Sequence, residues 1–374
     1  MNTIPPIDLT RHQEPIRAEI EEAMRRVFAS GAYIGGAQVN AFEEDFARYI
    51  GTEHCVSCNS GTDALVLSLR ALGIGVGDEV IVTSFSFIAT SEAIVLSGAK
   101  PVFVDIAAQS FSLDPEQLVA AITSKTRAIL PVHLFGSPAA MTQIMAIAED
   151  YNLYVIEDCA QSTGGQWRGK KLGSMGTAGC FSFFPTKNLG ACGDGGAITT
   201  NNAQLAAKAR ALKAHGSYER YRHESTGINS RLDALQAAIL QIKLRFLDRW
   251  NCQRQDVAAH YRNLLVNYPG IELPASKPEP VWNQYTIRVK QGSESRAKLR
   301  EKLAEQGVGS MVYYPIPLHL QPTYLQDGYI PPSLPQSELA AQEVLSLPMF
   351  PGLTEAEQVQ VAKALYAGLT TLGN

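Results

Sequence analysis

A lysine beside a glycine-rich loop is the first feature of this chain that could do chemistry. Lys187 follows the apolar stretch 180–184, and glycines are frequent from there to the β-branched run at 198–200. Glycine lets another backbone, a ring or a phosphate come close, and a lysine that loses solvation there becomes a nucleophilic amine. A solvated surface lysine is the alternative, so the neighbouring motifs must decide.

A second motif could bind an anion. Ser60, Gly61 and Thr62 follow an apolar strand and open a predicted helix. Free backbone N–H groups and the helix dipole both favour an anion at such a helix start. An ordinary helix cap by Ser60 or Thr62 is the alternative. A nucleoside triphosphate loop is not indicated, because the chain has no G-x-x-x-x-G-K-[ST] motif.

A third group is a carboxylate at the end of a buried strand. Asp158 follows the apolar residues 153–156, and a buried carboxylate is costly unless it meets a cation or hydrogen-bond donors. A protonated pyridine nitrogen would be such a partner; a capping aspartate is the alternative. Ser182 could donate its hydroxyl to the same phosphate as Thr62, or it could face solvent. Together, these groups suggest a pyridoxal phosphate site.

Short apolar strands alternate with helix-length segments through the first two thirds of the chain. Helical spacing appears at 14–29 and 38–50. The strands expected after these are 54–58, 79–83, 101–104, 127–132, 153–157, 180–184 and 196–200. Helix-length segments between them are 62–72, 86–97, 115–123 and 139–150. This alternation predicts an α/β fold with a mostly parallel sheet covered on both faces, whose ligands bind at the carboxyl ends of the strands.

The pattern changes near residue 250. A long helix is expected to open near Arg231 and to link two domains, because apolar residues recur at three-four spacing from 232 to 246. We expect a large domain over 1–249 and a small C-terminal α+β domain over 250–374. The small domain should contain a strand at 285–289 and helices at 338–345 and 355–369, with a loop rich in proline and tyrosine at 313–318.

Composition excludes several classes of protein. The 374 residues are 45% hydrophobic and 18% charged, with a net charge of −4, which indicates a globular protein without a basic face for nucleic acid. No apolar run reaches the length of a membrane span, and no signal peptide is recognisable. The six cysteines are scattered, so neither a disulfide framework nor a metal site is expected. We therefore expect a cytoplasmic protein.

The sequence resembles the nucleotide-sugar aminotransferases of the DegT family, which have the aspartate-aminotransferase fold (fold type I) of pyridoxal phosphate enzymes. The resemblance covers nearly the whole chain, and its motifs occur together and in order. They are Ser30-Gly31 with 33–36, Ser60 to Leu65, Ser84 to Thr90, Glu157 to Gln161, Phe181 to Phe183 leading to Lys187, Gly227 to Asp233, and Tyr314-Pro315 with His319 to Pro322.

The resemblance implies roles for residues around the cofactor. Lys187 would hold pyridoxal phosphate as an internal aldimine and later carry the proton between cofactor and substrate carbons. Asp158 would pair with the pyridinium nitrogen and keep the ring an electron sink. Gln161 would hydrogen-bond the ring hydroxyl, and Phe87 would stack on the ring unless it is a plain core aromatic.

The resemblance also implies a shared site in a homodimer. Gly61, Thr62 and Ser182 would hold the phosphate, and Asn229 would reach it from the neighbouring subunit. Residues in motifs that line the sugar-nucleotide pocket of relatives are Arg231, Tyr314 and His319, although prolines and tyrosines in such a loop can be purely structural.

The implied activity is transfer of an amino group, from glutamate, to a nucleotide-linked keto sugar for polysaccharide or glycoside synthesis. Residues 215–238 are most similar to members that aminate carbon 3 of a keto hexose or hexuronic acid, but carbon 4 enzymes share most motifs. Two alternatives remain. Dehydratases of the family carry histidine in place of the lysine, which favours transamination here, and a non-catalytic regulatory homologue would not need the complete set of site residues.

Overall fold

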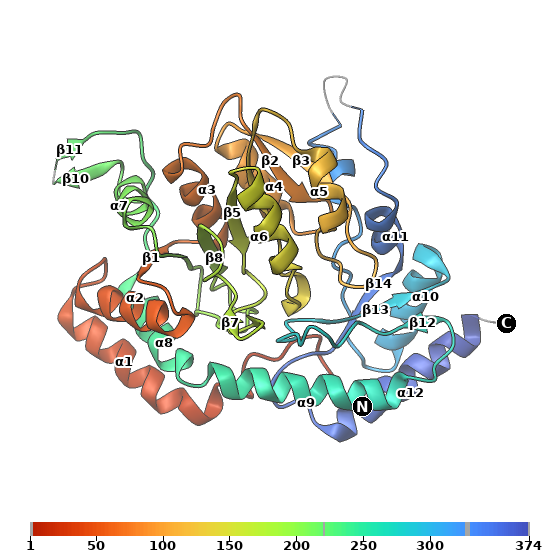
Figure 1. Cartoon of the computed structure of the whole chain (residues 1–374). Coiled ribbons are helices and arrows are strands. Elements are labelled where there is room, and N and C mark those ends of the chain that lie inside the picture. Colours follow the sequence, from red (N-terminus) through yellow and green to blue (C-terminus); the bar gives the residue numbers. More distant parts are fainter. Residues whose placement is uncertain (1–2, 220, 326–329, 373–374) are drawn as a thin grey trace.

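A central sheet of seven strands organises the computed structural model, which describes residues 3–219, 221–325 and 330–372 (Figure 1). Its strand order is β1-β9-β8-β5-β4-β2-β3. The bounds are β1 His54–Cys58, β2 Glu79–Thr83, β3 Lys100–Val104, β4 Thr126–Leu130, β5 Tyr154–Asp158, β8 Ala178–Ser182 and β9 Gly196–Thr200. All neighbours are parallel except that β9 runs antiparallel to β1 and β8. The predicted α/β fold with a mostly parallel sheet is confirmed.

Helices cover both faces of the sheet because its strands are apolar on both sides. Val80 and Val82 pack on the face that carries α3 and α4, whereas Ile81 faces α6 on the other side. A second part of that other side packs against α1, α2 and α8. The bounds are α1 Arg17–Ser30, α2 Ala37–Ile50, α3 Gly61–Ala71, α4 Ile88–Leu96, α5 Leu118–Ala121, α6 Met141–Asp150 and α7 Ala203–Leu212.

Short elements complete the large part of the chain. The helical turns are η1 Glu14–Ile16, η2 Pro115–Gln117 and η3 Leu134–Gly136. The two hairpins are β6 Gln166–Trp167 with β7 Lys170–Lys171, and β10 Ser217–Glu219 with β11 Arg222–His223.

The predicted long helix is two helices. Arg231 precedes the first, α8 (Ala234–Leu244), because Asp233 has extended backbone. The second, α9 (Leu247–Leu265), starts after Phe246 and runs to the C-terminal unit along the lower edge of Figure 1. The predicted boundary at residue 250 therefore falls inside α9 and stays a prediction.

The C-terminal unit has its own three-stranded sheet. Its order is β12-β13-β14, with β12 Ile271–Glu272, β13 Tyr285–Val289 and β14 Val344–Leu347. Its helices are α10 Gly292–Glu305, η4 Leu318–Leu320, α11 Pro335–Glu343 and α12 Glu355–Leu372. The helix predicted over 338–345 is wrong at its end, because Val344 and Leu345 pair with β13.

The first described residues belong with this unit. The Ile4 N–H donates to the Gly307 carbonyl at 2.8 Å, and Ile4 packs into the C-terminal hydrophobic core. Ile4 thus lies on the C-terminal unit, although it precedes the large sheet in the sequence.

No helix in the described ranges combines the length and the apolarity that crossing a bilayer requires. All six cysteines are free, and only Cys192 and Cys252 are exposed.

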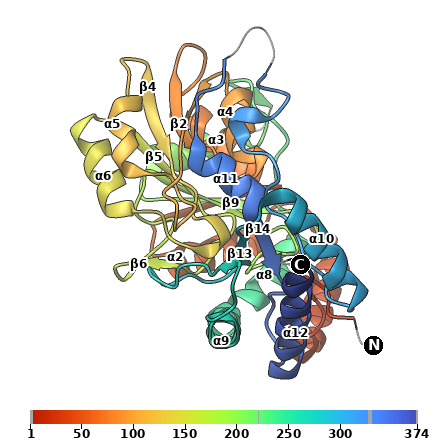
Figure 2. The same ribbon diagram turned by 90° about the vertical axis from the view of Figure 1, so that its right-hand side faces the viewer.

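Two buried charged residues connect the C-terminal unit to the large sheet. Figure 2 shows the two parts next to each other. Asp105, after β3, accepts hydrogen bonds from the Gln336 N–H at 2.8 Å and from the N–H and hydroxyl of Ser337 at 2.8 and 2.6 Å. It thus caps the start of α11 from the other unit. Arg288 on β13 pairs with Glu343 at 3.0 Å and donates to the Ala108 carbonyl at 2.8 Å.

We expect Asp105→Ala to lower the free energy of unfolding by about 2 to 3 kcal/mol, because it leaves buried donors of α11 without a partner. Urea unfolding at fixed protein concentration measures the change. Asp114→Ala is the control, since Asp114 caps only the short turn η2 by accepting from the Glu116 N–H, and it should cost below about 1 kcal/mol. Equal losses in the two variants would contradict a special role for Asp105.

Candidate active site

The predicted cofactor motifs meet at one edge of the sheet. β1, β2, β5 and β8 run in the same direction, so their carboxyl ends lie on the same side. Gly61 follows β1, Phe87 follows β2, Asp158 ends β5, and Lys187 follows β8. This is the edge at which ligands bind in sheets of this type.

The chain leaves the sheet earlier than predicted before it reaches the lysine. β8 ends at Ser182, whereas the apolar run continues to Phe184. The Phe183 N–H still donates to the Gly195 carbonyl at 2.7 Å, and the Ala191 N–H donates to the Phe183 carbonyl at 2.7 Å. Residues 183–191 therefore form a closed loop that carries Lys187, and Phe184 is exposed.

Gly61 and Ser182 form a narrow cradle at the start of α3. A Cβ placed on Gly61 would lie 2.7 Å from the Ser182 Cβ, so only glycine fits there without displacement. Ser60 caps the helix by accepting from the Asp63 N–H at 3.1 Å. The N–H groups of Gly61 and Thr62, at the start of the helix, have no intrahelical partner. The Thr62 side chain is half-buried. These donors suit a phosphate.

Asp158 is buried and held on both carboxylate oxygens. The Thr90 hydroxyl donates to Oδ2 at 2.9 Å and the Ala160 N–H donates to Oδ1 at 3.1 Å. Burial raises the pKa of Asp158, and the two donors together with the positive charge of Lys187 oppose that rise. A cation at this place would stabilise the carboxylate further.

Lys187 is activated by its surroundings. Burial lowers its pKa to about 8, and the charge of Asp158 acts in the opposite direction. The next residue anchors the loop: the Asn188 side chain donates to Asn251 Oδ1 at 2.7 Å and accepts from Asn283 Nδ2 at 2.8 Å. The sequence analysis missed Asn188, and its place beside Lys187 was the available signal.

Gln161 joins the site to the C-terminal unit. Its Oε1 accepts from the Phe135 N–H at 2.7 Å, and its Nε2 donates to the Tyr314 hydroxyl at 3.1 Å. The Phe87 ring is 55% exposed, and its centroid lies 6.0 Å from that of Tyr314. Phe87 is therefore not a plain core aromatic, and its ring is open to contact.

His319 is held on both ring nitrogens. Nδ1 bonds the Ser84 hydroxyl, and Nε2 lies 3.3 Å from Glu338 Oε1. The side chain is fully buried, which favours a role in holding the 313–322 loop against the segment after β2. Its predicted contact with substrate stays a prediction.

Asn229 and Arg231 lie between β11 and α8, and both are exposed. The backbone of Asn229 pairs with that of Ala214. Both side chains are thus accessible to another molecule, and their predicted roles stay predictions.

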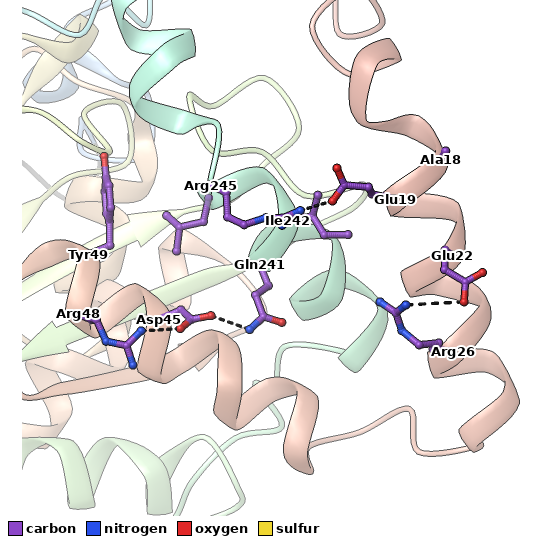
Figure 3. Close-up of a pocket in the computed structure, with 11 residues that line it drawn as sticks. Ala18, Glu19, Glu22, Arg26, Asp45, Arg48, Tyr49, Gln241, Ile242 and Arg245 are labelled. Atoms are coloured by element: carbon purple, nitrogen blue, oxygen red, sulfur yellow. Dashed lines mark hydrogen bonds and ion pairs between the residues drawn. The ribbon is translucent and has the colours of Figure 1, made fainter.

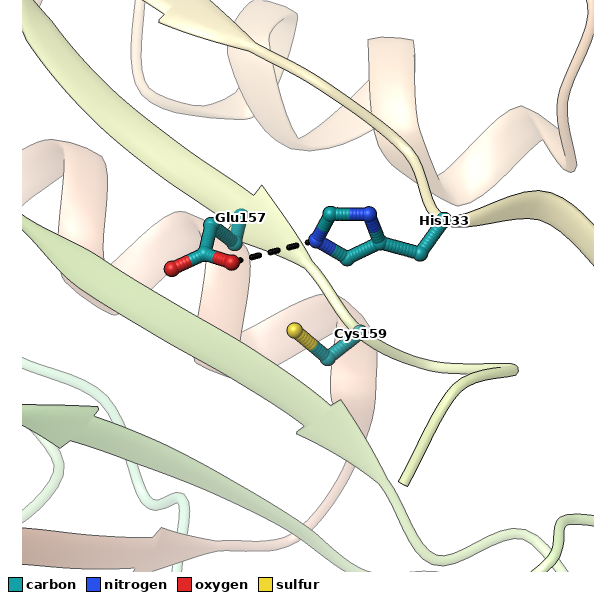
Figure 4. A group of neighbouring side chains, drawn as sticks. All are labelled: His133, Glu157 and Cys159. Atoms are coloured by element: carbon teal, nitrogen blue, oxygen red, sulfur yellow. Dashed lines mark hydrogen bonds and ion pairs between the residues drawn. The ribbon is translucent and has the colours of Figure 1, made fainter. Parts of the chain in front are cut away.

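Behind Asp158, a second carboxylate anchors the end of β5 (Figure 4). Glu157 faces the His133 ring at 3.1 Å, and it accepts from the N–H groups of Gly173, Met175 and Gly176 at 2.7 to 2.9 Å. Burial acts to raise its pKa, but these donors outweigh burial and hold it below the usual value. The Cys159 thiol lies beside the pair. Four donors satisfy the Glu157 carboxylate, which accounts for its burial.

A separate hollow of about 920 Å³ lies between α1, α2 and α8 (Figure 3). Ion pairs line this hollow, among them Arg245 with Glu19, which joins the end of α8 to α1, and Arg48 with Asp45 within α2. Its lining includes none of the residues at the sheet edge described above. We therefore place the candidate active site at the sheet edge, where the reactive groups converge.

The order of these motifs along the chain matches a known family. Residues 14–366 match the DegT/DnrJ/EryC1/StrS aminotransferase family. This chain belongs to that family. The predicted membership and the aminotransferase fold are confirmed.

Individual members of the family are similar over almost the whole chain. A pleiotropic regulatory protein of Geobacillus stearothermophilus is 47% identical over 97% of both chains. The dTDP-3-amino-3,4,6-trideoxy-alpha-D-glucose transaminase of Streptomyces venezuelae is 44% identical over 97% of this chain and 95% of that one. The crystal structure of S. venezuelae DesV with a ketimine intermediate superposes with a TM-score of 0.94, at 43% identity and 98% coverage of each chain.

The residues present fit the cofactor of this family. The Gly61–Ser182 cradle offers donors to a phosphate, Asp158 offers a buried negative charge to a ring nitrogen, and Lys187 offers an amine of lowered pKa. Pyridoxal phosphate combines the three complementary groups.

We expect the cofactor-free protein to take up pyridoxal phosphate faster as pH rises, with a midpoint near 8, because Lys187 is nucleophilic only when neutral. Stopped-flow absorbance measures the rate. Asp158 raises the pKa of Lys187, so Asp158→Asn should move the midpoint to lower pH. Asp248→Asn on α9 is the control and should leave it in place. A midpoint above 10 in the wild-type protein would contradict the lowered pKa.

Proposed function

We propose that this protein transfers an amino group from glutamate to the keto carbon of a nucleotide-linked sugar, with pyridoxal phosphate as cofactor. The observation that carries the proposal is the convergence of Lys187, Asp158 and the Gly61–Ser182 cradle at the carboxyl edge of the sheet. Family membership and the name of the Streptomyces venezuelae transaminase support it.

Pyridoxal phosphate, when bound, supplies an electron sink that makes a proton on the adjoining substrate carbon removable. The chain's own groups would hold the cofactor and move the proton. Lys187 Nζ would hold the cofactor and, as a free neutral amine, would take that proton and return it to the neighbouring carbon. Asp158 would offer a negative charge to the ring nitrogen, while Thr62 and Ser182 would hold the phosphate.

The residues proposed for the substrate come from two segments. Tyr314 lies beside Phe87 and Gln161, and Arg231 is an exposed cation that suits a phosphate of the nucleotide. His319 is a weaker candidate because its ring is already bonded at both nitrogens. Carbon 3 is the proposed position of amination, in a keto hexose or hexuronic acid.

We place the reaction in the cytoplasm, in the synthesis of cell-surface polysaccharide or glycoside. The six free cysteines support a reducing compartment. Regulation without catalysis is the second candidate, and the name of the Geobacillus stearothermophilus relative favours it. The complete set of Lys187, Asp158, Gln161 and Ser182 argues for catalysis.

We propose that the active unit is a homodimer in which each site is completed by the segment between β11 and α8 of the partner subunit, which carries Asn229. The exposed Asn229 side chain supports this, together with exposed aromatic and aliphatic residues on the same molecule, including Tyr33, Ile34 and Tyr218. Exposed apolar side chains of this kind are typical of interfaces.

Glutamate alone should react with wild-type protein that has been loaded with pyridoxal phosphate. It should release about one equivalent of 2-oxoglutarate per subunit, because the first half of a ping-pong reaction needs no sugar. A coupled dehydrogenase assay and the cofactor absorbance measure it. Lys187→Ala should release none, while Lys171→Ala, at the β6–β7 hairpin, should match the wild type. Cofactor binding without oxoacid release from any amino acid would instead support the dehydratase or the regulatory alternative.

Hybrid dimers test the shared site. Lys187→Ala and Asn229→Asp, each inactive alone, are co-expressed with different tags, and the hybrid is purified on both. If Asn229 serves the partner's site, one of the two sites has both native groups, and the hybrid should show about half the wild-type activity. If the site lies within a single chain, every site carries a defect and the hybrid stays inactive.

A further inference from the structure

Two buried hydroxyls lie directly behind the carboxylate of the active site. Ser86 is 4% exposed and Thr90 is 1% exposed. Both belong to the segment 86–90, in which Ser86 and Phe87 precede α4 and Thr90 lies in the first turn of α4. The Ser86 and Thr90 hydroxyl oxygens lie 2.9 Å apart, and the Thr90 oxygen lies 2.9 Å from Asp158 Oδ2.

The direction of these hydrogen bonds follows from the chemistry of the groups. An ionised carboxylate only accepts, so the Thr90 hydroxyl donates its single hydrogen to Asp158. Thr90 must then accept from Ser86, and the relay runs from Ser86 through Thr90 to Asp158. Each carboxylate oxygen holds one donor, since Oδ1 accepts from the Ala160 N–H, and each keeps a further lone pair for another partner.

The relay restricts rotation of the Asp158 carboxylate. Rotation of a carboxylate about its last bond is soft and roughly two-fold. A single donor on Oδ1 leaves that rotation open, whereas a second donor on Oδ2 fixes the plane of the group. The same segment also carries Phe87, whose exposed ring faces Tyr314. One segment therefore sets both the carboxylate plane and an aromatic surface of the site.

We propose that Thr90 is a positioning residue which, with the support of Ser86, holds the Asp158 carboxylate in the orientation that receives the protonated ring nitrogen of the cofactor. The inference rests on the proposed pyridoxal phosphate site and adds to it a group that does not itself touch the cofactor. A buried hydroxyl that merely satisfies its own hydrogen bond is the competing interpretation.

Several ionisable groups face Asp158 besides the relay. Lys187 approaches from the loop after β8 and His133 from the segment after β4. Cys180 on β8 and the Tyr314 hydroxyl also interact with its charge, as does Cys159 on its own strand. All of them are retained in the variants below, so differences between variants report the relay alone.

The test measures the dissociation constant of pyridoxal phosphate against pH, by equilibrium dialysis and by quenching of tryptophan fluorescence. Thr90→Val keeps the shape and removes the donor. We expect about ten-fold weaker binding near neutral pH. The Thr90 donor stabilises ionised Asp158 and so lowers its pKa. Its loss raises that pKa, and Thr90→Val should lose affinity on acidification at a higher pH than the wild type.

Three further variants complete the test. Thr90→Ser restores a hydroxyl and should bind within about two-fold of the wild type. Ser86→Ala should have a smaller effect than Thr90→Val, and the double variant should be no weaker than Thr90→Val alone, because the two hydroxyls act in series. Ser91→Ala is the matched control on α4, since the Ser91 hydroxyl bonds Ile88 and Tyr324 and not Asp158.

The outcomes separate the two levels of inference. If the wild-type protein does not bind pyridoxal phosphate, the proposed function fails. If the wild-type protein binds and Thr90→Val has the same affinity and loses it at the same pH on acidification, the positioning role fails while the function stands. A second result would also overturn the positioning role, in favour of packing. In that result Thr90→Val, Thr90→Ser and Ser91→Ala all lose affinity and melt at lower temperatures, while the pH at which affinity falls on acidification does not change.

Discussion

A buried negative charge at the end of a central strand is the constraint on which the site depends. Asp158 cannot stay ionised in the sheet without donors, and the chain supplies them from Thr90 and Ala160. Burial of Lys187 lowers its pKa, and the negative charge of Asp158 acts in the opposite direction by favouring the protonated amine. Each charge thus favours the charged form of the other, and a ring cation would stabilise the Asp158 carboxylate further.

The rest of the architecture serves to bring these two groups together. Adjacent parallel strands β5 and β8 place Asp158 and the lysine loop on one edge. The close approach of Gly61 to Ser182 requires glycine, and the Asn188 contacts tie the loop to α9 and to residue 283. Because Tyr314 comes from the C-terminal unit, the contacts of Asp105 and Arg288 between the units also support the site.

Much of the candidate site was recognisable along the chain because its parts are local. The turn at Gly61, the strand end at Asp158 and the lysine before the glycines are short motifs, and their order matched a family that the comparison confirmed. Their roles toward a cofactor stay predictions. Thr90 stands out in the sequence only as the end of the motif Ser84 to Thr90, because its hydrogen bond to Asp158 joins residues far apart in the sequence. The burial of His319 escaped detection for the same reason.

By itself, the sequence determined the seven strands and the α/β class, because strands buried on both faces must be apolar throughout. Tertiary structure decided where elements end. β8 stops at Ser182, and the Phe183 carbonyl accepts from the Ala191 N–H, which closes the loop that carries Lys187. The helix expected over 338–345 gives way to β14 because Leu345 pairs with Ile287. It also decided which hydroxyls reach Asp158. Such contacts depend on pairing between distant segments, and local propensity does not encode that pairing.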